Sequence, residues 1–262
     1  MTNTTNPQSD APLGVGSLIG DSFTILFRHF LTVVLLAVVP TLIGLTVSGM
    51  LVGLDTALGF NQPETTDVTA FTPLLISILV QFVVYGLTSG LLVQMAYDAK
   101  LERPLQPRRY FDPALRAVFP ISILSVAVAL MVALGFAALV VPGLWVYAVF
   151  CVMPVAVVIE KAGFGGLGRS ASLTKGYRWP ICGTLILSGI IVGLFNFAAS
   201  YLVGVLIVQV SGGVAGPIGV LAYGFLTAVA NGLTAILVAL IYARLREIKE
   251  GVSVSDISAV FD

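Results

Sequence analysis

Residues able to carry out chemistry are scarce in this sequence. Its single histidine, His29, adjoins Arg28, and no HExxH pattern accompanies it, so we expect an interface residue rather than a base or metal ligand. Its two cysteines, Cys151 and Cys182, lie in or beside apolar runs, where a small buried thiol is the ordinary role. No phosphate-cradling glycine loop followed by lysine is present. The sequence therefore predicts no catalytic residue, no metal site and no cofactor.

The strongest polarity inside the apolar runs belongs to four uncharged amides, Gln81, Gln94, Asn196 and Asn231. By residue counting, Asn196 and Asn231 both fall near the midplane of the membrane. A hydrogen bond between them would satisfy both amides in hydrocarbon, and such a bond typically stabilises by about 0.6 to 2 kcal/mol. Two interpretations stay open: these amides join helices, or they line a path for water or a polar ligand.

Lysine and arginine occur only in short segments next to the apolar runs. Each well-placed cation attracts anionic lipid headgroups by roughly 1 kcal/mol, although ordinary topology determination explains such segments equally well. The residues predicted to contact lipid headgroups or a partner protein are Arg28, Arg108, Arg109, Arg116, Arg169, Lys175, Arg178 and Trp179.

The amino-acid composition indicates that these residues belong to a protein embedded in a membrane. Apolar residues make up 58% of the chain and charged residues 10%, whereas soluble domains usually carry charge on roughly a quarter of their positions. Charge-free runs cover 30–54, 68–97, 117–159 and 179–243. Since about 20 apolar residues cross the hydrocarbon as a helix, the sequence predicts an all-α integral membrane bundle in one domain, 14–250.

The longer runs each divide into two spans. The third run is interrupted at Pro142-Gly143, and the fourth by Ser211-Gly212-Gly213 and Gly216-Pro217, so each is predicted to form a hairpin. Tails are predicted at 1–13 and 251–262. The six predicted transmembrane helices are 30–53, 74–97, 119–141, 144–160, 183–210 and 218–243.

The charges test this count, because they were not used to place the breaks. Six spans put every lysine and arginine on one face, while the other face receives Asp55, Glu64 and Asp67. Basic segments stay in the cytoplasm, so both termini are predicted to be cytoplasmic. The apolar run starting at residue 30 follows no basic signal region and is expected to be a retained anchor.

Amphipathic segments precede the spans on this basic face. Apolar residues recur at helical spacing over 14–29, Asp112-Pro113 is typical of a helix start for 112–118, and a third segment covers 166–176. We expect three interfacial helices on the cytoplasmic face. Each precedes a pair of spans, which raises the hypothesis of three repeats of one unit.

The second half of the chain carries an ordered set of motifs. They are Pro-Gly-Leu-Trp at 142–145, Pro154, Glu160, Ser170, Leu-Thr-Lys-Gly at 173–176, Trp179, and Tyr-Ala-Arg-Leu-Arg at 242–246. In order and spacing they resemble a largely uncharacterised bacterial and archaeal family of six-span proteins, similar to the membrane domain fused in some bacteria to glycerophosphoryl diester phosphodiesterases. The resemblance implies a bacterial inner (plasma) membrane. It implies no hydrolase activity, because this sequence has no counterpart of the catalytic barrel.

The sequence favours a non-enzymatic membrane module that acts as a scaffold for partner proteins or in membrane lipid organisation. The alternative is a transporter or exporter of a small amphiphilic substrate that does not use buried carboxylates for proton coupling. Expected partners are membrane lipids, not nucleic acid. Two GxxxG patterns, Gly86 to Gly90 and Gly189 to Gly193, allow close helix approach, either within one chain or between copies or other membrane proteins.

Overall fold

A computed structural model describes residues 12–59, 61, 68–211 and 217–251. Over these residues the regular structure is helical, without a strand, and six helices are long and apolar enough to cross a membrane. The predicted all-α bundle with six membrane-spanning helices is therefore confirmed. The predicted tails 1–13 and 251–262 lie almost wholly outside the described residues.

The helices follow one another with short connections. In chain order they are α1 (Val15–Arg28), α2 (Phe30–Val52), α3 (Leu54–Ala57), α4 (Val68–Lys100), α5 (Pro107–Ala138), α6 (Val140–Phe150), α7 (Met153–Ile159), α8 (Gly166–Thr174), α9 (Arg178–Ser211) and α10 (Pro217–Glu250). The six candidate spans are α2, α4, α5, α6 with α7, α9 and α10.

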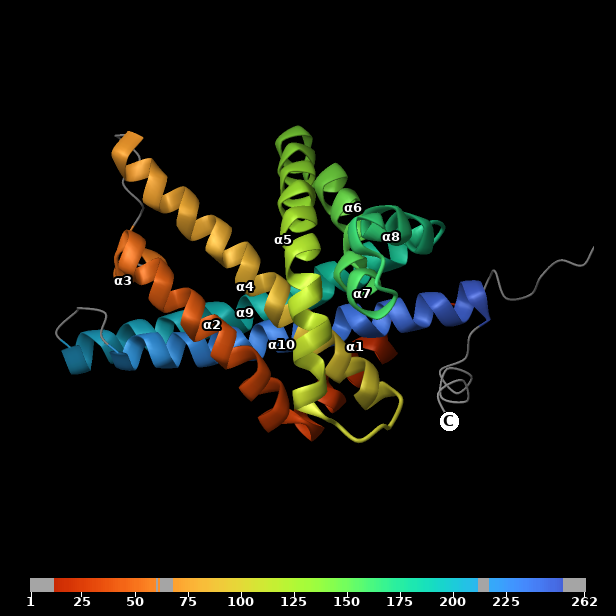
Figure 1. The fold of residues 1–262 in the computed structure, drawn as a ribbon, viewed down its shortest axis with the longest axis horizontal. Coiled ribbons are helices and arrows are strands. Elements are labelled where there is room, and N and C mark those ends of the chain that lie inside the picture. The colour runs from red at the N-terminus through yellow and green to blue at the C-terminus, as the bar shows by residue number, and fades with distance from the viewer. Residues whose placement is uncertain (1–11, 60, 62–67, 212–216, 252–262) are drawn as a thin grey trace, which may run out of the picture.

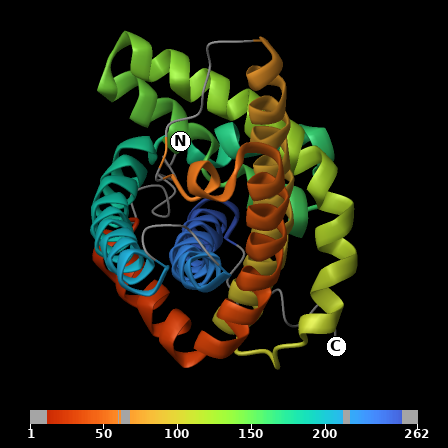
Figure 2. The same cartoon turned by 90° about the vertical axis from the view of Figure 1, so that its left-hand side faces the viewer.

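Three helical hairpins diverge from a common end of the molecule. Helix α2 packs on α4, α5 on α6, and α9 on α10. Figure 1 shows these hairpins pointing in different directions, away from the region that contains α7 and α8. Figure 2 is turned by 90°, so that the left-hand side of Figure 1 faces the viewer, and shows α5 and α6 extending across the direction of α10. We call this shared end the base. It is formed by α1, α7, α8, the last turns of α4 and α10, and the first turns of α5 and α9.

The apolar core lies near the base rather than along the whole length of the spans. Fully buried side chains such as Val33, Leu92, Ile121, Val155 and Ile241 come from the half of each span that is nearer the base. A small second cluster lies nearer the tips of two hairpins and contains Leu45, Leu58 and Val203. Toward the tip of the α5–α6 hairpin the apolar side chains are exposed, among them Leu130, Leu134, Leu139 and Val140.

Glycines set how closely two pairs of helices approach. A Cβ atom on Gly90 of α4 would lie 3.1 Å from the Cα and Cβ of Ala114 in α5. In the α5–α6 hairpin, a Cβ on Gly135 would lie 2.8 Å from the Cα of Gly143. By contrast, nothing lies within 4 Å of a Cβ placed on Gly189 or Gly193 of α9. The first GxxxG pattern is thus used inside the chain, and the second lies on an open face.

The predicted interfacial segments differ in outcome. The segment 14–29 forms α1, and 166–176 contains α8. The prediction of a separate helix at 112–118 is wrong, because Pro107 at the first turn already begins α5, which continues through Pro113. The carbonyl that Pro113 leaves without its usual partner belongs to the exposed Arg109, away from the apolar part of α5.

The break between the third and fourth spans lies earlier than predicted. Leu139 is extended, with φ −166° and ψ 160°, and α6 begins at Val140. Pro142 therefore lies in the first turn of α6, where a backbone N–H has no intrahelical partner and proline is tolerated. Pro142-Gly143 starts the helix rather than separating the spans.

The fourth span, predicted as one helix over 144–160, is interrupted after Phe150. Pro154 near the start of α7 lacks the N–H that a continuous helix would use. Helix α8 supplies other donors at this break: the hydroxyls of Ser170 and Thr174 donate to the Val149 carbonyl oxygen, at 2.7 and 3.2 Å. Both hydroxyl-bearing side chains are fully buried, so α8 is fixed to the interrupted span.

Replacing Ser170 by alanine should therefore destabilise the protein by about 1 kcal/mol, since one donor to a buried carbonyl is lost and Thr174 provides the other. The measurement is the apparent melting temperature of purified protein in detergent. The control is Ser172→Ala, because the exposed Ser172 hydroxyl donates to the Arg169 carbonyl of its own helix. Equal melting temperatures for Ser170→Ala and Ser172→Ala would contradict this function of α8.

Candidate functional site

A network of charged side chains joins three helices at the base. Glu160, just after α7, accepts two hydrogen bonds from Arg169 of α8, from Nε at 2.6 Å and from Nη2 at 2.7 Å. The hydroxyl of Tyr242 in α10 also donates to Glu160. Glu250 accepts from Arg169 and, at 2.8 Å, from Nε of Arg246. Two carboxylates thus neutralise two guanidinium groups that come from α8 and α10.

The local chain path brings Arg169 to Glu160. Helix α7 ends at Ile159, and the next residues turn the chain back, with Lys161 in the left-handed region at φ 54°. The turn at Gly163–Gly165 then leads into α8, whose first turns place Arg169 beside Glu160. The bidentate guanidinium–carboxylate geometry makes this a strong pair.

The electrostatics of Glu160 follow from this geometry. Partial burial by itself raises the pKa of the Glu160 carboxyl. Hydrogen bonds from Arg169 and Tyr242, with the positive charges of Arg169 and Arg246, outweigh that effect, so the pKa of Glu160 lies below its usual range. The same pairing raises the pKa of Arg169. Both groups stay charged at neutral pH, so neither is suited to proton transfer.

Two of the predicted amides join helices. Gln81 Nε2 donates to the Ser48 hydroxyl of α2 at 3.0 Å. Gln94 Nε2 donates to the backbone carbonyls of Gly90 at 2.7 Å and Tyr110 at 3.0 Å, which links α4 to α5. These contacts agree with the interpretation that such amides hold the bundle together.

The other two amides do not meet. Asn196 Nδ2 donates to the Val192 carbonyl of its own helix at 2.9 Å, and Asn231 is exposed on α10. Among the described hydrogen bonds, none joins Asn196 to Asn231, so the expected bond between them is not formed. A single helix turn already satisfies one amide donor, which removes the need for a partner across the interface.

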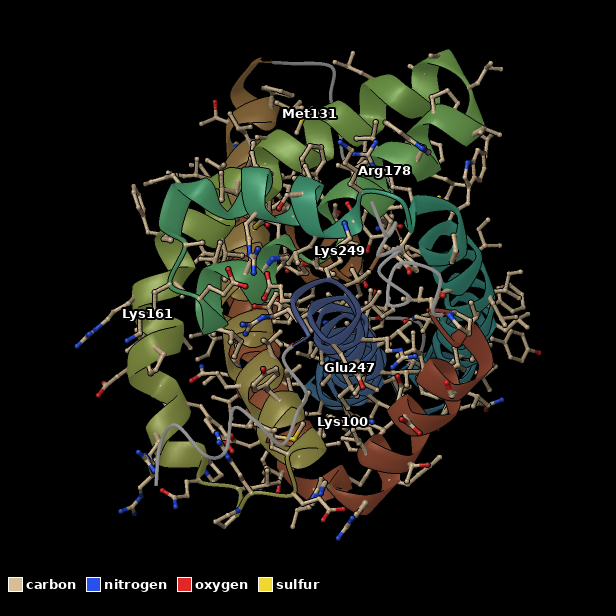
Figure 3. All side chains as sticks on the ribbon, turned by 90° about the vertical axis from the view of Figure 1, so that its right-hand side faces the viewer. Lys100, Met131, Lys161, Arg178, Glu247 and Lys249 are labelled. Atoms are coloured by element: carbon tan, nitrogen blue, oxygen red, sulfur yellow. The ribbon has the colours of Figure 1, made fainter. Side chains whose placement is uncertain are left out.

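Of the residues predicted to contact headgroups or a partner, one forms ion pairs inside the chain and most of the others are exposed. Arg169 is neutralised by Glu160 and Glu250, so its expected role in contacting headgroups or a partner gives way to an ion pair inside the chain. Arg28, Arg108, Arg109, Arg116, Lys175 and Trp179 are exposed, whereas Arg178 is partly buried with its guanidinium 4.5 Å from the centre of the Trp145 ring. Figure 3 shows the side of the molecule on which Arg178 and Lys249 lie.

Sequence reasoning missed several of these residues. Tyr242, Arg246 and Glu250 were not predicted as site residues, nor were Lys249 and Trp145. A usable signal was present for one pair, since Arg246 and Glu250 are four residues apart on a helix and form an ion pair. The pairing of Glu160 with α10 spans 82 residues and carries no local signal.

The arrangement has the features of a structural ion-pair network, not of a catalytic constellation. Among the described residues no group of three or more histidine, cysteine, aspartate or glutamate side chains could hold a metal ion. Comparison of the chain with protein-family models, curated proteins and solved structures gave no match. The evidence on function therefore comes from the surfaces of the chain itself.

Proposed function

We propose that this chain is a non-enzymatic integral membrane module that organises membrane lipids around its hairpins. The observation that carries the proposal is the divergence of the hairpins from a packed base. In the most apolar window of α9 only 22% of the residues are buried, and in α5 33%, compared with 61% in α10. In a bilayer such open apolar faces must be covered by lipid chains or by other membrane helices.

The exposed basic residues support the lipid assignment. Arg28, Arg108, Arg109 and Arg116 are exposed at the base, where they can attract anionic headgroups. By the positive-inside rule we place the base and both termini in the cytoplasm, and by the sequence resemblance we place the protein in a bacterial inner membrane. A scaffold for protein partners would use the same exposed faces and is the competing outcome of the experiment below.

Transport of a small amphiphilic molecule is the second candidate, and one observation favours it. Tyr85 shares a helix face with the buried Ser89, Leu92 and Ala96, yet its own side chain is 47% exposed. Tyr147 of α6 lies near Tyr85 and is 36% exposed. Two partly exposed phenol side chains thus lie just beyond the core, where a substrate with a polar end would find hydrogen-bonding groups.

The first experiment is purification from native membranes in mild detergent, followed by mass spectrometry of everything that stays bound. We expect phospholipid at a defined stoichiometry and no stoichiometric protein. A stoichiometric protein partner would replace lipid organisation by the scaffold function. Uptake of an amphiphile by proteoliposomes that is lost in Tyr85→Phe/Tyr147→Phe would move the assignment to transport.

A further inference from the structure

Lys175, Arg178 and Lys249 form a cluster of positive charge at the base, where the loop before α9 meets the end of α10. Arg178 and Lys249 lie on the same side of the molecule (Figure 3), and the charges of Lys175 and Arg178 are among those that act on the Lys249 ammonium. None of the ion pairs between described residues includes any of the three. This separates the cluster from the neighbouring Arg169 and Arg246, which are neutralised by carboxylates. Three like charges repel one another, and a bound anion would relieve that repulsion.

Several hydrogen-bond donors of the cluster have no acceptor among the described residues. Nε of Arg178 is buried and has no hydrogen-bond partner among the described residues. Lys249 Nζ donates to the Ser172 carbonyl at 2.8 Å, which leaves two of its three N–H groups for another acceptor. Helix α9 begins at Arg178, so the positive end of its dipole lies at the same place. Together these donors suit an oxyanion such as phosphate.

An apolar stripe leads from this cluster along α9. Trp179 is 67% exposed, and Gly183, Ile186, Ile190 and Leu194 follow on the same helix face and are also exposed. No atom lies within 4 Å of the position that a Cβ on Gly183 would occupy. Because tryptophan favours the boundary between headgroups and hydrocarbon, the cluster is at headgroup depth and the stripe at acyl-chain depth.

We propose that Lys175, Arg178 and Lys249 bind the phosphate of an anionic phospholipid whose acyl chain lies along the α9 stripe. This site rests on the proposed role in lipid organisation and names the lipid class. A zwitterionic headgroup carries an ammonium group of its own, which the three cations repel. The anionic headgroup of phosphatidylglycerol has no such cation and matches the charge of the cluster.

The chain's own fluorescence provides a local test, because its two tryptophans, Trp145 and Trp179, both adjoin the cluster. The full chain is reconstituted in vesicles that contain either phosphatidylglycerol or phosphatidylcholine with brominated acyl chains, which quench nearby tryptophan. We expect phosphatidylglycerol to bind at least about 5-fold more tightly, the factor that corresponds to roughly 1 kcal/mol for one well-placed charge. The variant Lys175→Gln/Arg178→Gln/Lys249→Gln should lose this preference.

The matched control removes two other cations from the base, in Lys100→Gln/Lys161→Gln, to which no lipid contact is assigned, and should keep the preference. Because Arg178 stacks on Trp145, Lys175→Gln/Lys249→Gln is tested as well; it leaves that contact in place and should still weaken the preference. Equal loss in the Lys100→Gln/Lys161→Gln control would assign the effect to general surface charge and overturn the site.

Two further outcomes would also overturn the site. If inorganic phosphate abolished the phosphatidylglycerol preference when chloride at equal ionic strength did not, soluble phosphate would be the ligand and the lipid assignment would be wrong. If the wild-type chain showed no preference yet retained phospholipid on purification, this site would fail while the proposed lipid function stood. Absence of any retained lipid would instead remove the proposed function itself.

Discussion

Gly90→Leu should destabilise the protein more than any single substitution in the charged network of the base or in α8. The Cβ of a side chain at this position meets the Cα and Cβ of Ala114 at 3.1 Å, and Ala114 is fully buried in the core. A leucine adds three more carbons beyond that Cβ, so α4 and α5 must move apart at this contact. Overpacking of this kind costs about 3 kcal/mol. The melting temperature and the yield of monodisperse protein in detergent should both fall sharply.

The matched control for this change is Gly193→Leu. Gly193 belongs to the second GxxxG pattern, and no atom lies within 4 Å of the place where its Cβ would be. We expect wild-type stability for the monomer carrying this substitution. If Gly193→Leu were as damaging as Gly90→Leu, contact of the α9 face with a second copy or another helix would have to be part of the stable protein.

The contrast between the two glycine patterns illustrates what sequence can and cannot predict for a membrane bundle. Both patterns permit close approach of helices, and their residue types are equivalent. Which one is used depends on the direction in which each helix face points after folding, and α9 presents Gly189 and Gly193 away from the rest of the chain. The presence of six spans, in contrast, depends only on the length of the apolar segments and on the absence of charged residues within them. Both properties can be read from the sequence.

Prolines show a second limit of sequence interpretation. The sequence predicts a break at Pro142 and a helix start at Pro113, yet both prolines lie inside helices. Proline is tolerated in the first turn, and Pro113 leaves only the carbonyl of an exposed residue without its helical partner. Pro154 does accompany a break, because α8 provides the hydroxyl donors that the interrupted span needs. The effect of each proline therefore depends on which donors are nearby, and those come from distant parts of the chain.

The basic residues show the same dependence on tertiary structure. From the sequence, Arg169 and Arg178 look alike, since both follow the fourth span in a basic segment. In the folded chain Arg169 binds two carboxylates, whereas Arg178 stacks on Trp145 and its buried Nε has no hydrogen-bond partner among the described residues. The difference arises because Glu160, after α7, and Glu250, at the end of α10, both reach Arg169, and no described ion pair joins either of them to Arg178. The charge pattern predicts a basic face, but it does not predict which cations stay available to a ligand.

Glu160→Gln should have the second largest effect, about 2 kcal/mol. Glutamine keeps the size of the side chain but removes the negative charge that Arg169 and Arg246 share, and one amide cannot accept both bonds from Arg169 as a carboxylate does. Removing one member of a fully buried pair costs about 3 to 5 kcal/mol, and partial exposure of these groups to solvent reduces that figure. The control is Glu247→Gln, whose ion pair with Arg244 is more exposed and lies within one helix turn.

The dependence of stability on pH separates loss of this charge from a simple packing defect. Because the pKa of Glu160 is lower in the folded chain than in the unfolded chain, its ionisation stabilises the fold above the unfolded value of about 4.3. That contribution is lost as the pH falls through the lower pKa of the folded state. The melting temperature of the wild type should therefore exceed that of Glu160→Gln by a constant amount between about pH 7 and 5, and should approach it as the pH is lowered from about 5 toward 2. A difference that stayed constant down to about pH 2 would mean that the network depends on the shape of residue 160 and not on its charge, and that its ion pair with Arg169 does not hold α8 to the end of α7.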